Sequence, residues 1–418
     1  MRFGSVVSIG TMAGALPVLA ACGAGLQAFG VNPNAGAPMA RTPATESVLH
    51  SFGAPGDGAL PVAGLIDAGG TMYGTTTLGG RRVGSLCSVT GCGTVFSVTP
   101  DGKEAVVYAF SGSDGADPSA GLVDVSDVLY GTTSYGGTRG QGTVFSVTRS
   151  GKERVLYSFG KKPDGQMPVA GLVAAGDTLY GTTFYGCAND TGCVFSISRS
   201  GREKVLYSFK ADSYGDGAYP EAGLTEVGGK LYGTTGGGGS GAGTVFEIAL
   251  TGKERVLYRF ASYGGDGRSP DSALVARGGT LYGTTLSGGT NNFGTVFSVT
   301  RDGKERVLHR FHGVPDGLTP FGGLVDVGGT LYGTTWQGGM KSGESDAGVG
   351  TIFSIAPSGK ERVVYAFAGP PDGALVHAGL IEVNGALYGA ASSGGAYPEK
   401  DCPAGYADGC GAIFKLTL

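Results

Sequence analysis

Residues 171–209 read GLVAAGDTLYGTTFYGCANDTGCVFSISRSGREKVLYSF, and this stretch decides the fold. It contains four short apolar segments, GLVAA, TLYGTT, CVFSIS and EKVLYSF, separated by turn residues. Gly-Asp joins the first two segments and Arg-Ser-Gly-Arg joins the last two, and both are hairpin signals. Apolar residues occupy both faces of the last two segments, as expected for a sheet that is covered on both sides. The stretch therefore predicts one four-stranded antiparallel sheet, with strands A to D in chain order.

The second of these segments marks a repeat that runs along the chain. Its LYGTT motif, or a close variant, recurs at a spacing of about fifty residues. The tyrosines of the motif are Tyr73, Tyr130, Tyr180, Tyr232, Tyr282, Tyr332 and Tyr388. Such a period is typical of propellers and solenoids, in which each unit needs its neighbours to cover its faces. Seven anchors predict seven units.

The two ends of the repeated region are complementary. Residues 46–52, ESVLHSF, begin with Glu46, end with Phe52 and align with strand D of the other units. Residues 411–418, GAIFKLTL, match strand C, and no strand D follows them. We therefore predict an all-β, seven-bladed β-propeller with four antiparallel strands per blade, closed by the N-terminal strand D, which completes the C-terminal blade. The alternative is an open solenoid, although solenoids usually end in atypical capping repeats.

The repeated elements also carry a family resemblance. LYGTT, a Gly-rich loop, GTVF, SGKE, VLYSF, and DG followed by Pro and AGL recur between residues 46 and 418. In this combination the chain resembles the tandem GloVer repeat family of bacterial surface proteins, whose repeats are similar to kelch-type propeller units. The resemblance implies a surface propeller. It supplies no catalytic motif, so it carries over architecture only.

The composition excludes one class of partner. The chain has 83 glycines among 418 residues, 15% charged residues and a net charge of -4. The high glycine content fits many short strands joined by turns. Binding a nucleic-acid backbone requires a basic stripe, which this sequence lacks. We therefore expect no nucleic-acid partner.

The N-terminus reads as an export signal with a lipid anchor. Arg2 precedes an apolar segment too short to span a bilayer, and LAAC ends at Cys22. This motif resembles a bacterial lipobox, which implies a signal peptide over 1–21, lipidation of Cys22, a flexible tether over 22–45 and the propeller over 46–418. The glycine after the cysteine favours the outer membrane or cell surface within the cell envelope. The alternative is an ordinary signal peptide cleaved near Ala21.

Strand alternation places the B–C loops and the D–A connections at one end of the ring, here called the loop face. Each D–A connection carries an Asp-Gly pair, and a carboxylate before glycine is a common turn element. The aspartates are Asp57, Asp114, Asp164, Asp216, Asp266, Asp316 and Asp372. A calcium site is the alternative, but it needs six to eight converging oxygens, and no unit has several acidic residues at close spacing. We expect turn residues and no metal.

Six cysteines follow Cys22 as three close pairs, each within one B–C loop. The pairs are Cys87 with Cys92, Cys187 with Cys193, and Cys402 with Cys410. Export to an oxidising compartment favours three local disulfides. Zinc ligation is the alternative, but two thiols per loop fall short of the four ligands of a structural zinc site.

Aromatic residues gather on the loop face, where variable loops on a rigid scaffold commonly bind ligands. Those near the B–C loops or in D–A connections are Tyr135, Phe184, Tyr185, Trp336, Tyr214, Tyr219 and Tyr263. Exposed rings could stack on sugars or anchor a protein partner. Alternatively, they pack beneath their own loops.

Two further sets are interpreted as structural. Lys-Glu or Arg-Glu pairs recur in the C–D turns on the opposite face, as in Lys152 and Glu153, and read as solvated turn residues. His50 and His309 occupy the slot that tyrosine fills in the other strands D, such as Tyr157, and read as core substitutes.

Two classes of function remain. No GxSxG, HExxH or phosphate-loop motif is present, and neither His312 nor His377 has a nucleophile assigned to it. We expect a monomeric, noncatalytic binding or scaffolding protein without cofactor, whose ligand is a glycan, a cell-wall component or a protein. The alternatives are a hydrolase or lyase with an axial active site and a lectin-like glycan-binding module. Clustered His, Asp and Glu near the axis would favour an enzyme, whereas a peripheral aromatic patch would favour a binder.

Overall fold

The chain folds from strands and turns. A computed structural model describes residues 44–82, 86–211, 215–261, 263–340, 347–397, 402 and 409–418. In these residues there is no helix, and therefore none long and apolar enough to cross a membrane. Residues Pro43–Leu418 form one compact unit. The predicted signal peptide and Cys22 lie outside the described residues, as does nearly all of the predicted tether.

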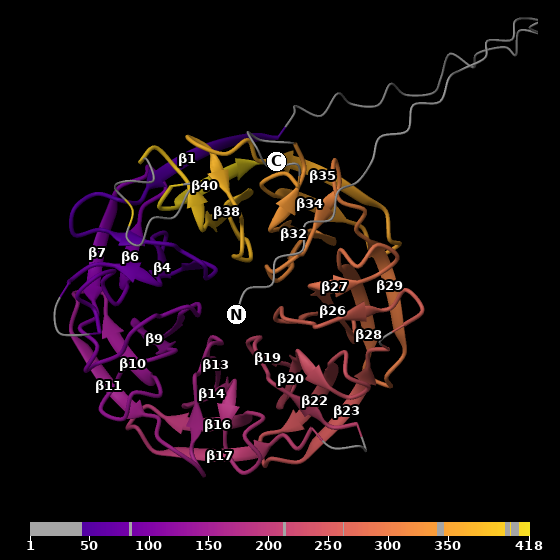
Figure 1. The fold of residues 1–418 in the computed structure, drawn as a ribbon, viewed down its shortest axis with the longest axis horizontal. Coiled ribbons are helices and arrows are strands. Elements are labelled where there is room, and N and C mark those ends of the chain that lie inside the picture. Colours follow the sequence, from indigo (N-terminus) through magenta and orange to yellow (C-terminus); the bar gives the residue numbers. More distant parts are fainter. Residues whose placement is uncertain are drawn as a thin grey trace, which may run out of the picture. The chain divides into compact units, whose positions relative to one another are not determined.

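Seven four-stranded antiparallel sheets form a ring, which confirms the predicted seven-bladed β-propeller (Figure 1). The A strands, nearest the centre, are β3 (Ile66–Asp67), β8 (Val123–Val125), β13 (Val173–Ala175), β19 (Thr225–Glu226), β25 (Val275–Arg277), β31 (Val325–Val327) and β37 (Ile381–Val383). The B strands are β4 (Met72–Thr76), β9 (Val128–Thr133), β14 (Thr178–Thr183), β20 (Lys230–Thr235), β26 (Thr280–Thr285), β32 (Thr330–Thr335) and β38 (Ala386–Ala391).

The outer half of each blade consists of strands C and D. The C strands are β6 (Thr94–Val98), β10 (Thr143–Thr148), β16 (Cys193–Ser198), β22 (Thr244–Ala249), β28 (Thr295–Thr300), β34 (Thr351–Ile355) and β40 (Ala412–Thr417). The D strands, at the rim, are β7 (Glu104–Ala109), β11 (Glu153–Ser158), β17 (Glu203–Ser208), β23 (Glu254–Arg259), β29 (Glu305–Arg310), β35 (Glu361–Ala366) and β1 (Thr45–Ser51). Blades are numbered here by their strands A, from β3 in blade 1 to β37 in blade 7.

The LYGTT motif is explained by packing around strand B. A Cβ on Gly131 would lie 2.7 Å from Cζ of Phe145 and 2.9 Å from Cδ2 of Leu122, so only glycine leaves room for the phenylalanine ring of strand C. The first threonine, Thr132, donates a hydrogen bond to the Ala170 carbonyl oxygen of the next blade at 3.0 Å. The motif therefore fixes both the interior of a blade and its junction with the next.

A phenylalanine at the end of each strand D seals the contact between neighbouring blades. The Phe159 ring is fully buried and meets Phe195 of the next blade edge to face, with ring centres 5.2 Å apart. The same contact recurs at every junction, in Phe52–Phe96, Phe110–Phe145, Phe159–Phe195, Phe209–Phe246, Phe260–Phe297, Phe311–Phe353 and Phe367–Phe414. Large aromatic side chains buried in this way dominate core energetics.

The predicted closure of the ring is confirmed. Strand β1 pairs antiparallel with β40, from Thr45 opposite Thr417 to Ser51 opposite Ala412. The register shifts between Val48 and His50, as it does in the C–D pairs of the other blades. The N-terminal strand therefore replaces the missing strand D of the last blade.

The glutamates of the C–D turns are not solvated, so that interpretation was wrong for them, although Lys152 is exposed as expected. One carboxyl oxygen of Glu153 is buried and finds no hydrogen-bond partner among the described residues. Burial, followed by the charge of Asp114 in the preceding D–A connection, raises the pKa of Glu153 to about 7. The D strands of neighbouring blades follow one another along the rim of the ring (Figure 1). Glu153, the first residue of β11, therefore interacts with Asp114, which lies in the connection that leaves β7.

Candidate functional site

The loop face is held together by short ribbons in which a D–A connection pairs with a B–C loop. They are β2 (Gly58–Ala59) with β5 (Leu78–Gly79), β12 (Gly165–Gln166) with β15 (Tyr185–Gly186), β18 (Gly217–Ala218) with β21 (Gly237–Gly238), β24 (Gly267–Arg268) with β27 (Ser287–Gly288), β30 (Gly317–Leu318) with β33 (Gln337–Gly338), and β36 (Gly373–Ala374) with β39 (Ser393–Gly394). A bridge between Ala116 and Tyr135 takes the same place in the remaining connection. The B–C loops, which vary in length, are thus held to the D–A connections by the same kind of backbone pairing.

At the same place in each D–A connection stands a non-glycine residue with positive φ, between 51° and 57°. These residues are Leu60, Asp117, Met167, Tyr219, Ser269, Thr319 and Leu375. Backbone bonds impose the strain: the Tyr219 N–H donates to the Thr191 carbonyl at 2.9 Å, and its carbonyl accepts from the Gly236 N–H at 3.0 Å. Such strained positions persist only where the surroundings fix them. They fix the direction in which the chain enters the centre of the ring.

Small residues meet where the seven connections converge. A Cβ on Gly171 would lie 3.0 Å from the carbonyl oxygen of Gly121 in the neighbouring blade, so only small residues fit there. This axial ring consists of Gly64, Gly121, Gly171, Gly223, Ala273, Gly323 and Gly379. Two positions earlier stand partly exposed residues that differ from repeat to repeat: Val62, Ser119, Val169, Glu221, Asp271, Phe321 and His377.

Of that second set, here called the mouth residues, sequence reasoning considered only His377. The available signal was the position after proline in the P-x-A-G-L pattern, which varies while its neighbours change little. In the fold these residues line the axial mouth, so the side chains at the mouth differ from one connection to the next. Consecutive connections present Glu221, Asp271, Phe321 and His377.

Three of the predicted aromatic residues come together across two connections, and are called the aromatic platform. Phe184 and Tyr185 lie with ring centres 4.4 Å apart, and Tyr219 lies 5.4 Å from Phe184 and 5.7 Å from Tyr185. Tyr185 keeps 39% of its surface exposed. The platform is therefore neither fully buried beneath its loops nor scattered, and it offers aromatic surface to a ligand.

The glycines 236–239, here called the glycine strip, lie next to the aromatic platform. A Cβ on Gly237 would lie 3.0 Å from a ring carbon of Tyr219, and one on Gly236 would lie 3.6 Å from a carboxyl oxygen of Glu221. No side chain of this stretch covers the tyrosine or the glutamate. The aromatic platform and Glu221 therefore border the same glycine strip.

Glu221 also belongs to a carboxyl pair with Asp271 of the next connection. Burial, followed by the charge of Glu221, raises the pKa of Asp271 well above its usual range. Asp271 Oδ1 is buried without a hydrogen-bond partner among the described residues. The raised pKa makes Asp271 a candidate proton donor at the mouth, next to Glu221.

Two further mouth residues, Phe321 and His377, form a second aromatic group with Trp336. Trp336 lies 6.0 Å from Phe321 and 5.5 Å from His377 between ring centres, and its indole Nε1 is buried without a hydrogen-bond partner among the described residues. Burial lowers the pKa of His377. Ser392 Oγ donates to the Leu375 carbonyl, so the 3.1 Å bond between Ser392 and His377 Nδ1 requires a proton on Nδ1. Nε2 of the neutral imidazole is then an acceptor.

Tyr135 stands apart from both groups. It lines a cavity of about 380 Å³ together with Asp117 and Ser119. Burial raises the pKa of Asp117 to about 6, and Ser119 bonds to Ser134 at 2.7 Å. Polar groups thus line this cavity beneath an exposed tyrosine.

Tyr263 is 89% exposed and lines a shallow cavity with Asp266 and Arg268. Tyr214 lies outside the described residues. The structure therefore brings together Phe184, Tyr185 and Tyr219, groups Trp336 with Phe321, and leaves Tyr135 and Tyr263 separate.

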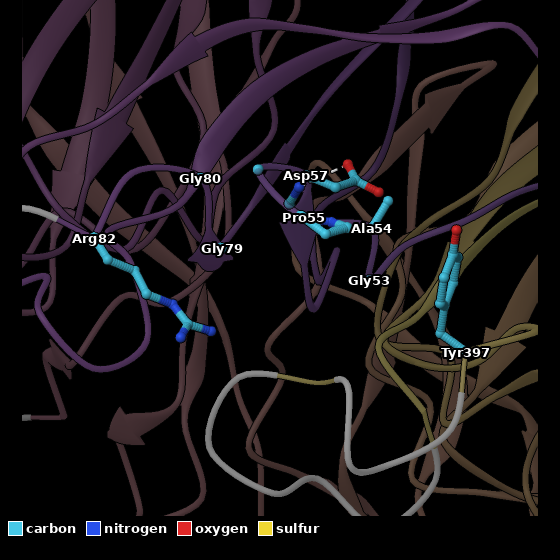
Figure 2. Close-up of a pocket in the computed structure, with 10 residues that line it drawn as sticks. Gly53, Ala54, Pro55, Asp57, Gly79, Gly80, Arg82 and Tyr397 are labelled. Atoms are coloured by element: carbon cyan, nitrogen blue, oxygen red, sulfur yellow. Dashed lines mark hydrogen bonds between the residues drawn. The ribbon is translucent and has the colours of Figure 1, made fainter.

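A cavity of about 660 Å³ lies where the ring closes, between the D–A loop after β1 and the last blade. Figure 2 shows Arg82 and Tyr397 on either side of the loop that carries Pro55 and Asp57. Backbone of glycine-rich segments forms most of the remaining wall. The closure thus leaves a hollow with one cationic and one phenolic side chain.

The seven repeated aspartates serve their connections. Asp164 accepts hydrogen bonds from the Gly160 and Gly165 N–H groups, both at 2.8 Å, and from the Tyr157 hydroxyl at 3.0 Å. His50 and His309 replace this tyrosine, each with Nε2 3.1 Å from its aspartate. Each carboxylate thereby ties a D–A connection to the end of strand D.

The three predicted disulfides are present: Cys87–Cys92, Cys187–Cys193 and Cys402–Cys410. Each ties a B–C loop back to the start of its own strand C. All six cysteines are buried. Because Cys187 lies two residues after Tyr185, one bridge braces the loop that carries the aromatic platform.

The chain is thus a seven-bladed β-propeller whose loop face presents aromatic and carboxyl groups. It belongs to the Gloeobacter/Verrucomicrobia repeat family, whose sequence profile matches residues 84–266 and 241–401. No curated protein matches the chain significantly.

Solved structures share the fold at low sequence identity. A candidate 6-phosphogluconolactonase from Bacteroides uniformis has a TM-score of 0.47 and 15% identity, over 78% of this chain and 88% of that one. A puromycin hydrolase has a TM-score of 0.51 and 13% identity, over 80% and 50%. A puromycin-hydrolysing peptidase from Mycobacterium tuberculosis has a TM-score of 0.47 and 12% identity, over 84% and 53%. The chain spans about half of each puromycin-hydrolysing protein, and the likeness concerns the fold alone.

Proposed function

We propose that the protein is a carbohydrate-binding propeller held at the cell envelope by a lipid on Cys22. The observation that carries the binding part is the aromatic platform, in which Phe184, Tyr185 and Tyr219 pack at ring distances of 4.4 to 5.7 Å while Tyr185 stays exposed. Flat apolar faces beside polar groups suit sugar rings, whose C–H faces stack on aromatics. Glu221 supplies the polar contact across the glycine strip, since a carboxylate accepts hydrogen bonds from sugar hydroxyls.

The N-terminal sequence and the disulfides support the location. LAAC ending at Cys22 follows a short apolar segment, and the disulfides fit an oxidising compartment. A lipid at Cys22 would hold the propeller at the envelope, where glycans are present. Binding and anchoring are separate parts of the proposal.

The binding test is a screen of the full chain against envelope and cell-wall oligosaccharides, followed by titration calorimetry of each ligand found. Removing an exposed ring that stacks on a ligand costs about 1–3 kcal/mol, so Tyr185→Ala should weaken binding by roughly 5- to 150-fold. Tyr263→Ala is the matched control, because that ring is exposed on the same face but lies outside the platform. Equal affinity of the wild type and Tyr185→Ala would reject the platform as the binding surface.

A second function is favoured by the chemistry of the mouth. The raised pKa of Asp271 favours its protonated form, and the Nε2 atom of His377 is an acceptor, so the axial mouth holds both a candidate acid and a candidate base. This is the arrangement expected of a hydrolase. The discriminating experiment incubates each bound glycan with wild type and with Asp271→Asn and follows cleavage by mass spectrometry. Cleavage that disappears in the variant would establish catalysis, and an intact glycan would reject it.

A further inference from the structure

A cluster of two imidazoles and a carboxylate lies at the end of β29, away from the mouth residues. His309 Nε2 is 3.1 Å from Asp316 Oδ2, and His312 Nδ1 is 3.5 Å from the same oxygen. One ligand atom from each of the three residues lies within 4.8 Å of the others. His309 and Asp316 are largely buried, whereas the His312 side chain is 62% exposed.

This cluster has an imidazole that the equivalent turns of the other repeats lack. In five blades a tyrosine and an aspartate suffice for the same turn. At the ring closure His50 and Asp57 lie with Glu104, but no second imidazole joins them. At the place of His312 the other repeats have Gly53, Ser111, Gly160, Lys210, Ala261 and Ala368. Only this connection therefore brings a second imidazole to the aspartate.

The distances suit a metal ion. Zinc–nitrogen and zinc–oxygen bonds of about 2.0–2.2 Å in a tetrahedron place ligand atoms about 3.3 Å apart. The separations of 3.1 and 3.5 Å around Asp316 Oδ2 bracket that value. The exposed His312 ring is free to close the remaining gap to His309.

A carboxylate of the neighbouring blade lies near these three residues. Glu361, the first residue of β35, faces Asp316 and His309, and one of its carboxyl oxygens is buried without a hydrogen-bond partner among the described residues. Asp316 and Glu361 also line one cavity of about 360 Å³, together with Pro315 and Met340. The cavity gives an ion room to enter between the two carboxylates.

We propose that His309, His312, Asp316 and Glu361 bind a zinc-type divalent transition-metal ion. Two imidazoles and two carboxylates form a donor set that zinc accepts, whereas calcium and magnesium prefer oxygen ligands alone. Because Glu361 belongs to blade 6 and the other three ligands to blade 5 and the connection that leaves it, the ion cross-links two blades.

The test uses the full chain without an added histidine tag, stripped with a chelator and titrated with zinc chloride by calorimetry. Metal retained after gel filtration is then counted by mass spectrometry. We expect one zinc per chain at this site, and at least tenfold weaker binding in His309→Tyr and in His312→Ser. Both new residues already stand at these places in another repeat, as Tyr108 and Ser111, so the variants should fold and should melt like the metal-free wild type.

His50→Tyr is the matched control, because it makes the same substitution at the closure, where no second imidazole is present. It should bind zinc like the wild type. Zinc should raise the melting temperature of the wild type and of His50→Tyr, but not that of His309→Tyr. The proposal is overturned if the wild type binds no zinc, if His309→Tyr and His312→Ser keep wild-type affinity, or if His50→Tyr loses zinc equally.

Discussion

Phe52→Ala tests whether the N-terminal strand closes the ring. Phe52 is fully buried after β1 and meets Phe96 of blade 1 edge to face, with ring centres 5.1 Å apart. Truncating a buried phenylalanine to alanine costs about 3–5 kcal/mol, through lost apolar burial and the cavity that remains. We expect a loss of that size in the free energy of unfolding, measured by urea denaturation with fluorescence and circular dichroism.

Phe159→Ala is the internal control, because Phe159 makes the same contact with Phe195 at 5.2 Å in the middle of the chain. If β1 is an ordinary strand D of the ring, the two variants should lose free energy of unfolding within about 1 kcal/mol of each other. A loss of several kcal/mol in Phe159→Ala beside a negligible loss in Phe52→Ala would refute closure by β1.

Three further predictions concern the junctions, strand B and the anchor. The pKa of Glu153 is raised to about 7, so the folded protein holds a proton that the unfolded chain releases near 4.5. The free energy of unfolding should therefore fall as pH rises from about 4.5 through about 7, and it should fall less steeply in Glu153→Gln. Urea midpoints that rise over this range would contradict the burial of Glu153 beside Asp114. Gly131→Ala should lower the free energy of unfolding by about 1–3 kcal/mol, because the new Cβ overlaps Phe145. In Gly236→Ala the Cβ has ordinary contacts from 3.5 Å, so the free energy of unfolding should change by less than about 1 kcal/mol. Equal urea midpoints of the two variants would contradict the packing of Gly131 against Phe145. Cys22→Ser should move the protein from the membrane fraction to the soluble fraction, and continued lipid labelling of the variant would exclude the anchor.

The ring could be predicted from the sequence because its determinants are local and repeated. The LYGTT glycine, as at Gly131, and the phenylalanines of strands C and D recur at a fixed phase, and the ends of the chain supply complementary strands. The pairing of the cysteines also followed from short spacing. Local patterns of this kind need no knowledge of distant contacts.

The site could be predicted only in part, because it depends on contacts between different repeats. Phe184, Tyr185 and Tyr219 were recognisable as loop aromatics, but the sequence does not reveal that positive φ at Tyr219 brings its ring beside the other two. Glu221 and Asp271 are separated by a whole repeat and meet only because the connections converge. The buried glutamates, such as Glu153, were misread because their neighbour is the preceding blade.

Hydrogen–deuterium exchange of the full chain, with and without a bound oligosaccharide, tests the central claim of glycan binding on the loop face most directly. We predict slower exchange in residues 184–186 and 217–238, which carry the aromatic platform, the glycine strip and Glu221. Unchanged exchange there, with protection confined to the opposite face at residues 149–153 or to the loop at Tyr263, would contradict it.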